Sequence, residues 1–287
     1  MFNLKEKLIN EYGDEVANKI CDGYQIKKAV CIRINTSKIG VEDLKKELDN
    51  LRIRYRVVEF SDSALILDNV TEFDLQNMKI YEDGLIYLQS LSSQLPPLFM
   101  DLKDNEQILD MAAAPGGKTC EMACLANVMI TACEKNRIRC ERLKYNINKQ
   151  GIKRITVMQV DARNLDDYFK FDKVLLDAPC SGSGTLTNCL LDGDLVDRSV
   201  KFQKELLEKA IKLVKKDGII VYSTCSVLKE ENENIIREFI GKQLEVVPIN
   251  IDGDLPLLKS DISGTICLYP NDLYEGFFIA KLRKIVD

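Results

Sequence analysis

The stretch at residues 108–119, ILDMAAAPGGKT, constrains the fold of this chain more than any other. A short strand pattern runs into small residues and then into PGGKT, from which a helix can continue. Small side chains let the backbone approach a ligand, and the first turn of a helix offers N–H groups without intrahelical partners. The spacing matches neither the GxxxxGK[ST] phosphate-binding loop nor the GxGxxG dinucleotide fingerprint. The stretch therefore predicts a turn that holds an adenosine-bearing cofactor, which the rest of the chain must identify.

The composition is typical of a globular protein. The chain has 287 residues, of which 46% are apolar, which suits a large α/β domain with or without a small second one. No apolar run approaches the roughly 18 residues of a membrane-spanning helix, so we expect no membrane partner. The net charge of −5 argues against a protein that holds nucleic acid by bulk charge, although local basic patches remain compatible with it.

The cysteine and histidine contents limit the possible chemistry. The 10 cysteines show no CxxC pair and no repeated spacing, and no signal peptide precedes them. This pattern is typical of a reducing, cytoplasmic setting and predicts neither a disulfide framework nor a metal site. The chain contains no histidine, which excludes any mechanism with His as a base or a ligand. Enzymatic chemistry must then rest on Cys, Asp, Glu, Lys or a cofactor.

Residues 1–80 predict a small α+β domain ahead of the glycine turn. Its expected elements are helices within residues 1–28 and 41–48 and strands at residues 29–35, 51–60 and 64–67.

Alternation over residues 51–60 places Arg52, Arg54 and Arg56 on one strand face. Three cations on one face fit the phosphates of a nucleic acid, but a solvated sheet face explains them about as well. Residues 81–107 predict a connector with one helix, whose length Pro96 and Pro97 limit.

From residue 108 onward, strand and helix patterns alternate, which is typical of a parallel sheet covered by helices on both faces. The expected strands are residues 108–111, 128–133, 155–159, 173–177, 218–224, 244–249 and 277–282. The expected helices are residues 119–126, 136–150, 196–215 and 230–241. Residues 108–287 therefore predict a Rossmann-like, doubly wound domain, in which ligands bind beyond the carboxyl ends of the strands.

Acidic and sulfur-bearing side chains follow four of these strands. Glu134 follows the second strand, where a carboxylate can accept hydrogen bonds from ribose hydroxyls. Asp161 follows the third and can accept from an adenine amino group, although a helix-capping role is nearly as good an explanation. Cys180, in DAPCSGSG, follows the fourth, and Cys225, in STCS, follows the fifth. Two cysteines at the ligand edge of neighbouring strands favour a functional pair, whereas apolar packing explains the other cysteines.

The chain resembles the RNA cytosine-C5 methyltransferases of the NOL1/NOP2/Sun (RsmB/NOP) family from about residue 30 onward. The segments that carry the resemblance are IRINTSK, DGLIYLQSLSSQL, ILDMAAAPGGKT, ACEKNRIRCERLKYNINKQGI, QVDARNL, DKVLLDAPCSGSGT, YSTCSVLKEENENII and EGFFIAKL. The pairing of DAPCSGSG with STCS is the most specific of these matches.

The resemblance implies a class I S-adenosylmethionine-dependent methyltransferase fold, which is a seven-stranded doubly wound sheet. It also implies a small RRM-like domain that precedes this fold in the sequence and contacts RNA. It implies that Cys225 is the nucleophile and that Cys180 assists product release. Asp177 would lie between the cofactor and the cytosine, helped by Lys118. The residues implied to surround S-adenosyl-L-methionine are Ala112, Ala113, Ala114, Pro115, Gly116, Gly117, Lys118, Glu134, Asp161 and Asp177, with Arg139 a further candidate. The implied partner is structured rRNA or tRNA, bound by a monomer.

The chemistry of cytosine explains why such an enzyme needs cysteine. C5 belongs to an electron-poor ring, and addition of a thiolate at C6 makes C5 enamine-like and able to attack a sulfonium methyl group. Loss of the C5 proton then expels the thiolate, so that covalent catalysis divides one difficult step into easier ones. Without histidine, an Asp, Cys180 or water must move the protons.

Two other functions remain open at this point. A DNA cytosine-C5 methyltransferase takes its nucleophile from a Pro-Cys dipeptide, which Pro179-Cys180 supplies, but Cys225 and the AAPGGK turn argue against that class. A catalytically silent RNA-binding or ribosome-assembly factor is the second alternative, and the complete set of motifs argues against it. An amino-group methyltransferase would need a (D/N)PP(Y/F)-like motif where DAPC stands.

Overall fold

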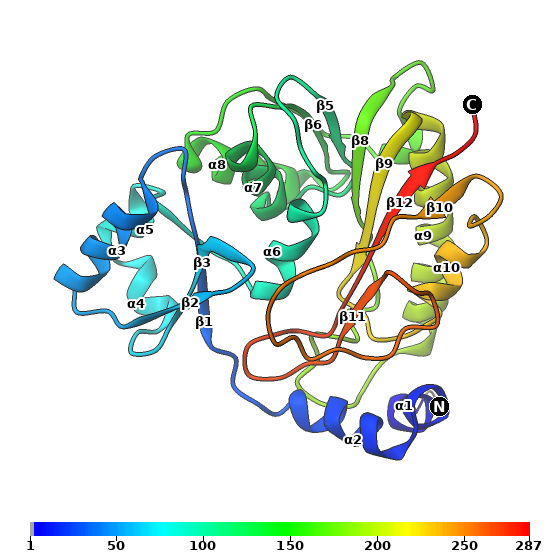
Figure 1. The fold of residues 1–287 in the computed structure, drawn as a ribbon, viewed down its shortest axis with the longest axis horizontal. Helices are drawn as coiled ribbons and strands as arrows, with labels where there is room; N and C mark the ends of the chain where they lie inside the picture. The colour runs from blue at the N-terminus through cyan, green and yellow to red at the C-terminus, as the bar shows by residue number, and fades with distance from the viewer. Residues whose placement is uncertain (1–2) are drawn as a thin grey trace.

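The computed structural model describes residues 3–287, which form two β-sheets that lie side by side (Figure 1). A four-stranded sheet lies next to an eight-stranded one. The first two residues of the helical segment expected over 1–28 lie outside the described residues. Within residues 3–287, no helix is long and apolar enough to cross a lipid bilayer, and no His, Cys, Asp and Glu side chains cluster as metal ligands.

The small sheet has the strand order β2-β3-β1-β4, with every neighbouring pair antiparallel. Ile32 and Leu65 on one face are buried with Leu44 and Leu48 of α3, while Cys31 and other side chains on the opposite face join the core of the large sheet. The small sheet is therefore covered on both faces. Its elements are β1 (Val30–Ile34), α3 (Val41–Asn50), β2 (Tyr55–Val58), β3 (Ser61–Leu67), α4 (Glu72–Gln76), α5 (Lys79–Glu82) and β4 (Ile86–Leu88).

The large sheet has the order β10-β12-β9-β8-β5-β6-β7, and β11 also pairs with β12. Five of its strands, β5 to β9, are parallel, and β12 runs antiparallel between β9 and β10. The chain passes from β5 outward through β6 to β7 and then returns to β8 on the other side of β5. The strands are β5 (Gln107–Asp110), β6 (Met129–Cys133), β7 (Ile155–Met158), β8 (Phe171–Asp177), β9 (Val214–Thr224), β10 (Leu244–Val246), β11 (Ile266–Leu268) and β12 (Phe277–Lys284).

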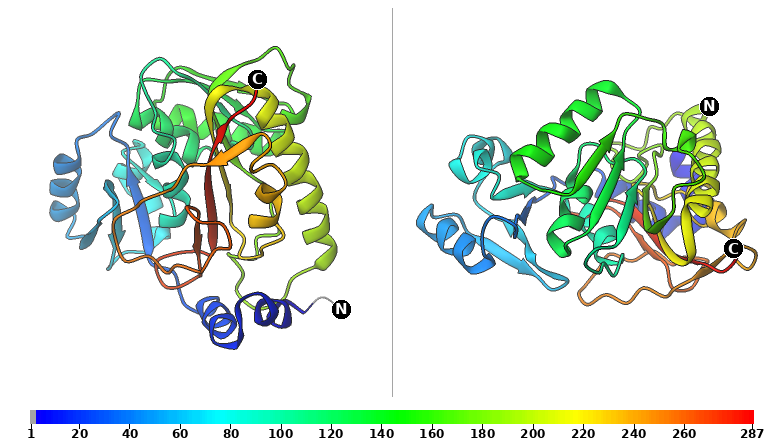
Figure 2. Two further views of the ribbon diagram at one scale, coloured as in Figure 1. Left: turned by 45° about the vertical axis from the view of Figure 1, so that its right-hand side comes forward. Right: turned by 90° about the horizontal axis from the view of Figure 1, so that it is seen from above.

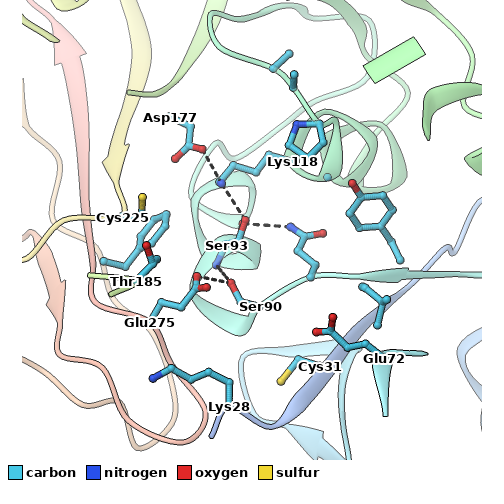
Figure 3. Close-up of a pocket in the computed structure, with 18 of the residues that line it drawn as sticks. Lys28, Cys31, Glu72, Ser90, Ser93, Lys118, Asp177, Thr185, Cys225 and Glu275 are labelled. Atoms are coloured by element: carbon cyan, nitrogen blue, oxygen red, sulfur yellow. Dashed lines mark hydrogen bonds and ion pairs between the residues drawn. The ribbon is translucent and has the colours of Figure 1, made fainter. Parts of the chain in front are cut away.

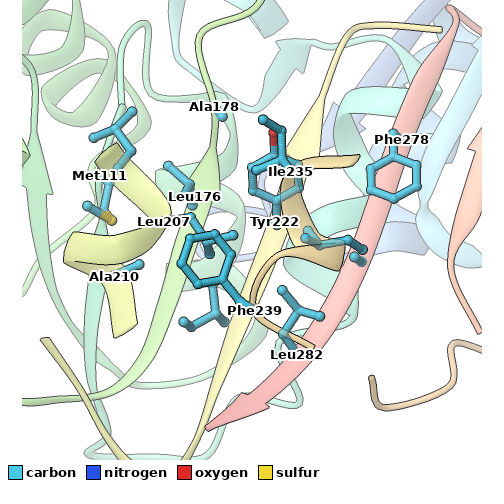
Figure 4. Close-up of a cluster of buried hydrophobic side chains, with 14 of the residues drawn as sticks. Met111, Leu176, Ala178, Leu207, Ala210, Tyr222, Ile235, Phe239, Phe278 and Leu282 are labelled. Carbon is cyan, nitrogen blue, oxygen red and sulfur yellow. The ribbon is translucent and has the colours of Figure 1, made fainter. Parts of the chain in front are cut away.

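Helices cover both faces of the large sheet, as the alternating sequence pattern predicts (Figures 1 and 2). Leu207 and Ala210 of α9 belong to one core cluster with Leu176 and Tyr222 of the sheet (Figure 4). Side chains of α6, α7 and α8 form a second cluster on the other face. The helices are α6 (Leu91–Leu98), α7 (Gly117–Leu125), α8 (Arg137–Gln150), the short η1 (Ala162–Asn164), α9 (Gly193–Leu213) and α10 (Glu233–Arg237).

The packing near the N-terminus differs from the expected division at residue 80. Helices α1 (Leu4–Tyr12) and α2 (Asp14–Gly23) bury Leu4, Leu8 and Ile20 in the core of the large sheet. Strand β4 lies inside the expected connector, yet it pairs with β1 of the small sheet. Both differences have one cause, since apolar side chains pack with whichever core they reach in space rather than with their neighbours in sequence.

Several expected elements are shorter than their sequence patterns suggest, and for two of them the structure shows a local cause. Strand β2 begins only at Tyr55, because Arg52 adopts a φ of 57° in a turn, so the three arginines do not line one strand face. Helix α10 spans only Glu233–Arg237, because Asn232 just before it bonds the Ser226 carbonyl oxygen. Such side-chain to backbone bonds compete with helical ones.

Two cysteines without an expected role form a pair. The structure joins Cys21 of α2 and Cys189, 168 positions later, as a disulfide, so the expectation of unpaired cysteines is wrong for these two. Helix α2 lies along the loop before α9, where the Tyr24 hydroxyl donates to the Ser183 carbonyl oxygen at 2.6 Å and the Gln25 amide donates to that of Thr187 at 2.8 Å. Docking of α2 creates this proximity, which cysteine spacing alone does not reveal.

Candidate active site

A cavity of about 540 Å³ lies where the small sheet meets the carboxyl ends of β5, β8 and β9 (Figure 3). One wall comes from β1, β4 and the start of α6, and the other comes from the turn after β5, Asp177, Cys225 and the start of β12. After β5 the chain continues to β6 on one side of β5, and it later returns to β8 on the other side of β5. The loops that follow β5 and β8 therefore diverge. This switch in strand order is where doubly wound sheets bind ligands.

The AAPGGK turn after β5 borders this cavity. Its backbone is fixed by the Ala113 N–H, which donates to the Cys133 carbonyl oxygen at 2.9 Å, and by the Asn146 side chain, which donates to that of Pro115 at 2.8 Å. Gly116 has a φ of 109°, and a Cβ atom there would lie 2.9 Å from Leu143 Cδ1. Helix α7 begins at the next residue, so its first turn faces the cavity.

An ion pair joins the turn to β8 across the cavity floor. Lys118 Nζ lies 2.8 Å from Asp177 Oδ2 and donates a second hydrogen bond to Ser93 Oγ at 2.9 Å. Ser223 Oγ donates to Asp177 Oδ1 at 2.8 Å, so both carboxylate oxygens have partners. Burial alone would lower the pKa of Lys118, but the charge and hydrogen bond of Asp177 outweigh it and raise that pKa. Lys118 is therefore a fixed cation, with Nζ 5.5 Å from the centre of the Phe277 ring.

The two predicted cysteines meet at the ends of β8 and β9. The Sγ atoms of Cys180 and Cys225 lie 3.1 Å apart, and only Cys225 lines the cavity. Their loops are joined by the Gly184 N–H, which donates to the Cys225 carbonyl oxygen at 2.9 Å. The hydrogen bond with Cys225, together with burial, raises the pKa of Cys180 well above its usual value. Cys180 thus keeps its proton at neutral pH.

The loop that carries Cys180 rests on a buried carboxylate that the sequence analysis did not identify. Glu231 accepts from the Ser181 N–H at 2.7 Å and from the Ser181 hydroxyl at 2.6 Å. Gln203 of α9 donates to the Pro179 carbonyl oxygen at 3.0 Å. These bonds fix the backbone on both sides of Cys180.

The predicted ribose and adenine residues line a second, smaller cavity of about 30 Å³. Glu134 is buried, accepts from the Asn136 N–H at 2.7 Å and lies 3.5 Å from Arg139. Asp161 lies 2.6 Å from Arg163, whose hydrogen bonds lower the pKa of that carboxyl. Ala112 lines both cavities, so the two lie next to each other along the strand ends.

The structure therefore divides the predicted residues between these two cavities. The first is lined by Ala112, Ala113, Ala114, Pro115, Gly117, Lys118, Asp177 and Cys225, and the second by Glu134 and Asp161 together with Arg139. Gly116 and Cys180 support the first cavity from behind, through Leu143 and Cys225 respectively.

Asp110 is a site residue that the sequence analysis missed. It ends β5, is buried at the cavity wall and accepts a hydrogen bond from Thr119 Oγ1 at 2.7 Å. Its Oδ1 atom is buried without a hydrogen-bond partner among residues 3–287. Burial raises the pKa of Asp110 to about 7. The rule that ligands bind beyond carboxyl ends of strands could have identified it, since it lies three residues before the AAPGGK turn begins at Ala113.

Glu275 and Phe277 were missed for a different reason. They lie at the start of β12, not at the end of a strand, and both line the first cavity. Because β12 is antiparallel to β9, its beginning lies beside the carboxyl end of β9, where Cys225 follows. A single sequence gives no sign of this reversed direction.

Comparisons with known proteins agree with this geometry. Residues 97–283 match the family model described as 16S rRNA methyltransferase RsmB/F, and residues 4–74 match the ferredoxin-like domain model of RsmF/B-like methyltransferases. A tRNA (cytosine(72)-C(5))-methyltransferase of Pyrococcus horikoshii is 36% identical over 98% of this chain and 69% of its own length. The ribosomal RNA small subunit methyltransferase F of Vibrio atlanticus is 34% identical over 88% of this chain, which spans 57% of that relative.

Solved structures lead to the same family. The superposition on NSun6 from Pyrococcus horikoshii with SFG has a TM-score of 0.91 at 26% identity. It covers 100% of this chain and 99% of the NSun6 chain. A methyltransferase homologue from the same organism has a TM-score of 0.86 at 32% identity, with 98% and 99% of the two chains covered. The strand order and the small antiparallel sheet agree with a class I methyltransferase fold that carries a ferredoxin-like domain. This chain belongs to the RsmB/F family of methyltransferases, the Sun family.

Proposed function

We propose that this protein transfers a methyl group from S-adenosyl-L-methionine to C5 of a cytosine in structured rRNA or tRNA. The observation that carries the proposal is the pair of sulfur atoms 3.1 Å apart, at the ends of β8 and β9, beside the Lys118–Asp177 ion pair. The names of the relatives, which include tRNA and rRNA methyltransferases, support the substrate class.

The residues of the two neighbouring cavities fit S-adenosylmethionine. The partnerless Oδ1 of Asp110 is suited to the ammonium group of an amino acid, because a buried carboxylate oxygen needs a donor. Glu134 is suited to ribose hydroxyls and Asp161 to an adenine amino group, while Ala112, Ala113 and Ala114 leave the backbone accessible. When bound, S-adenosylmethionine supplies an electrophilic methyl group on its sulfonium sulfur, which C5 of the base attacks.

Cys225 starts the reaction in this mechanism. Its thiolate adds to C6, the electrons of the C5–C6 double bond move through C4 to N3, and N3 takes up a proton from solvent. The Asp177 carboxylate then accepts a hydrogen bond from this N3–H and stabilises it. Lys118 keeps Asp177 in place and supplies positive charge beside the base.

Cys180 acts in the second half of the mechanism. After methylation a base removes the C5 proton, the C5–C6 double bond forms again and the C6–S bond breaks, which returns the electron pair to Cys225. Cys180 contacts Cys225 but lies outside the cavity lining. This position suits a group that donates or accepts a proton during the elimination.

The small unit over residues 1–80 is proposed to contact RNA, with residues 81–107 as the connector and residues 108–287 as the catalytic domain. The first cavity supports a contact between RNA and this unit, because β1 of the small sheet forms part of one cavity wall, next to β4 from residues 81–107. An RNA that places a cytosine beside Cys225 must therefore lie against both sheets.

Methyl transfer to RNA tests the proposal directly. Purified protein is incubated with S-adenosylmethionine labelled on its methyl group and with total RNA from cells that lack the gene, and bisulfite sequencing locates the modified cytosine. We expect labelled 5-methylcytosine with the wild-type protein and none with Cys225→Ala. Label in DNA but not in RNA would favour the DNA methyltransferase, and cofactor binding without label in either would favour the silent RNA-binding factor.

A further inference from the structure

Glu275 offers an unpaired carboxylate oxygen to the first cavity. Its Oε2 accepts from Ser90 Oγ at 2.7 Å, its backbone N–H donates to Ser92 Oγ at 3.0 Å and its carbonyl oxygen accepts from the same hydroxyl at 3.0 Å. These bonds fix the half-buried residue against the first turn of α6. No hydrogen bond or ion pair within residues 3–287 uses Oε1.

The position of Glu275 relative to the reacting cysteine is defined by the sheet. The antiparallel β12 brings residue 275 to the carboxyl end of β9, and the Gly276 N–H donates to the Gly184 carbonyl oxygen at 2.8 Å. Figure 3 shows Cys225 between Asp177 on one side and Glu275 on the other. Asp177 and Glu275 therefore face different edges of whatever is bound over Cys225.

The charge of Glu275 limits what it can contact. Lys28 is the cation that acts on Glu275 in the same cavity, but Lys28 Nζ donates to the carbonyl oxygens of Asn271 and Tyr274 and forms no ion pair with Glu275. The Glu275 carboxylate therefore still repels phosphate, and in an RNA complex it is suited to a neutral hydrogen-bond donor. In a cytidine, C6 is bonded to N1, which carries the ribose, whereas N3 lies across the ring from C6. With C6 over Cys225 and the N3 edge toward Asp177, the ribose lies toward Glu275.

From these positions we infer that Glu275 accepts a hydrogen bond from the ribose 2′-hydroxyl of the target cytidine and so selects RNA over DNA. The inference rests on the proposed cytosine methylation. A 2′-hydroxyl is the group by which a protein distinguishes the two nucleic acids at a given nucleotide. A carboxylate acceptor makes this contact stronger than a neutral one would.

The competing explanation for Glu275 is purely structural. Its bonds to Ser90 and Ser92 stabilise the start of α6, and Ser93 of that helix accepts from Lys118. If stabilisation were its only role, removal of the side chain would slow methylation of every substrate by the same factor. A comparison of two substrates that differ in one hydroxyl group separates these roles.

The experiment uses two synthetic RNAs that carry the cytosine located by bisulfite sequencing, one with cytidine and one with 2′-deoxycytidine at that position. The measured quantity is the ratio of kcat/KM for the two RNAs. We expect the wild-type protein to prefer the ribose substrate roughly tenfold or more, and Glu275→Ala to reduce this preference to about threefold or less. Glu275→Gln, with a neutral acceptor, is expected to give an intermediate ratio and serves if the alanine variant does not fold.

Two control variants isolate the contact. Ser90→Ala removes the hydroxyl that bonds Glu275 but keeps the carboxylate, and Glu72→Ala removes another carboxylate that lines the same cavity. Glu72→Ala should keep the wild-type ratio, whereas Ser90→Ala, which loosens Glu275 but leaves its carboxylate, should lower the ratio less than Glu275→Ala does. An unchanged ratio in both the alanine and glutamine variants of Glu275, while the wild-type protein methylates RNA, overturns the inference alone. Absence of methyl transfer by the wild-type protein overturns the proposed function and this inference with it.

Discussion

Cys180 and Cys225 stand 45 positions apart in the sequence, yet their sulfur atoms are 3.1 Å apart at adjacent strand ends. The parallel pairing of β8 with β9 sets this distance, since Asp177 lies opposite Ser223 in the register and each cysteine follows its strand within three residues. One sulfur lines the cavity and the other lies behind it. Because the two positions are not equivalent, the variants at each should fail in different ways.

Cys225→Ala should abolish methyl transfer, whereas Cys180→Ala should leave RNA attached to the protein. Without Cys225 no bond to C6 forms, and without Cys180 the bond forms but its elimination slows. Denaturing gels of each variant incubated with RNA and S-adenosylmethionine measure the adduct. Cys124→Ser, at a cysteine outside the cavity lining, should behave as wild type. An adduct with Cys225→Ala but not with Cys180→Ala would reverse the two roles.

The Lys118–Asp177 ion pair should contribute mainly to kcat. Lys118→Met removes the cation that holds Asp177 and its charge beside the base, so we expect kcat to fall about 100-fold or more. Ser93→Ala and Ser223→Ala each remove a single hydrogen bond, and their expected losses are roughly tenfold or less. Single-turnover methylation rates measure these effects. As a control, Lys144→Met removes an exposed lysine of α8 that pairs with Glu141 and should change kcat little.

Asp110 should make the stability of the free protein depend on pH. Burial raises its pKa to about 7, whereas an unfolded chain releases the proton at about pH 3.9. Between these values Asp110 binds its proton in the folded chain but not in the unfolded one, so its contribution to the free energy of unfolding falls as pH rises from about 4 to about 7. In Asp110→Asn this fall should be smaller by on the order of 2 kcal/mol.

Urea unfolding at about pH 4.5 and about pH 7.5 measures the difference between the Asp110 variant and the wild type. Asp62→Asn, at an exposed carboxylate of β3, should keep the wild-type slope. Equal slopes for Asp110→Asn and the wild type would show that Asp110 titrates in the same range in both states.

Strand ends explain how much of the site was predictable from the sequence. Cys225 was identified because parallel strands bring their carboxyl ends to one edge, whereas Lys118 and Asp177 were implied by the family resemblance. The structure places all three on one cavity. Glu275 was not identified because it precedes an antiparallel strand, whose direction depends on pairing between distant segments.

The fold shows the same division between local and distant information. The alternation of strands and helices after residue 108 predicts the large sheet well, because buried parallel strands and amphipathic helices have distinct periodicities. Strand β4 and the docking of α1 and α2 were not predictable, since three-residue strands and polar helices carry weak patterns. The register that joins Ile86 to Ile34 depends on packing across more than 50 positions, which no local pattern encodes.

Asp161 should contribute to cofactor affinity rather than to methyl transfer. It lines the second cavity, and Arg163 lowers its pKa, so it is an ionised acceptor throughout the neutral range. Asp161→Ala should weaken S-adenosylmethionine binding about tenfold in calorimetric titrations, the amount expected for one hydrogen bond to a charged group. Glu205→Gln weakens the other ion pair of Arg163 and leaves Asp161 intact, so its affinity should stay near that of the wild type. Equal affinities for Asp161→Ala and the wild type would exclude the adenine contact.

Gly116→Ala should destabilise the protein through both backbone strain and a steric clash. The φ of 109° is unfavourable for alanine, and the added Cβ would lie 2.9 Å from Leu143 Cδ1, inside the core between the turn and α8. Gly241→Ala is a matched control, because Gly241 also has a positive φ, of 75°, but nothing lies within 4 Å of its added Cβ. We expect a loss of about 1 kcal/mol for Gly241→Ala from strain alone, and a further 1–3 kcal/mol, roughly, for Gly116→Ala from the clash. Urea unfolding measures both losses, and equal values would mean that Leu143 moves away without cost.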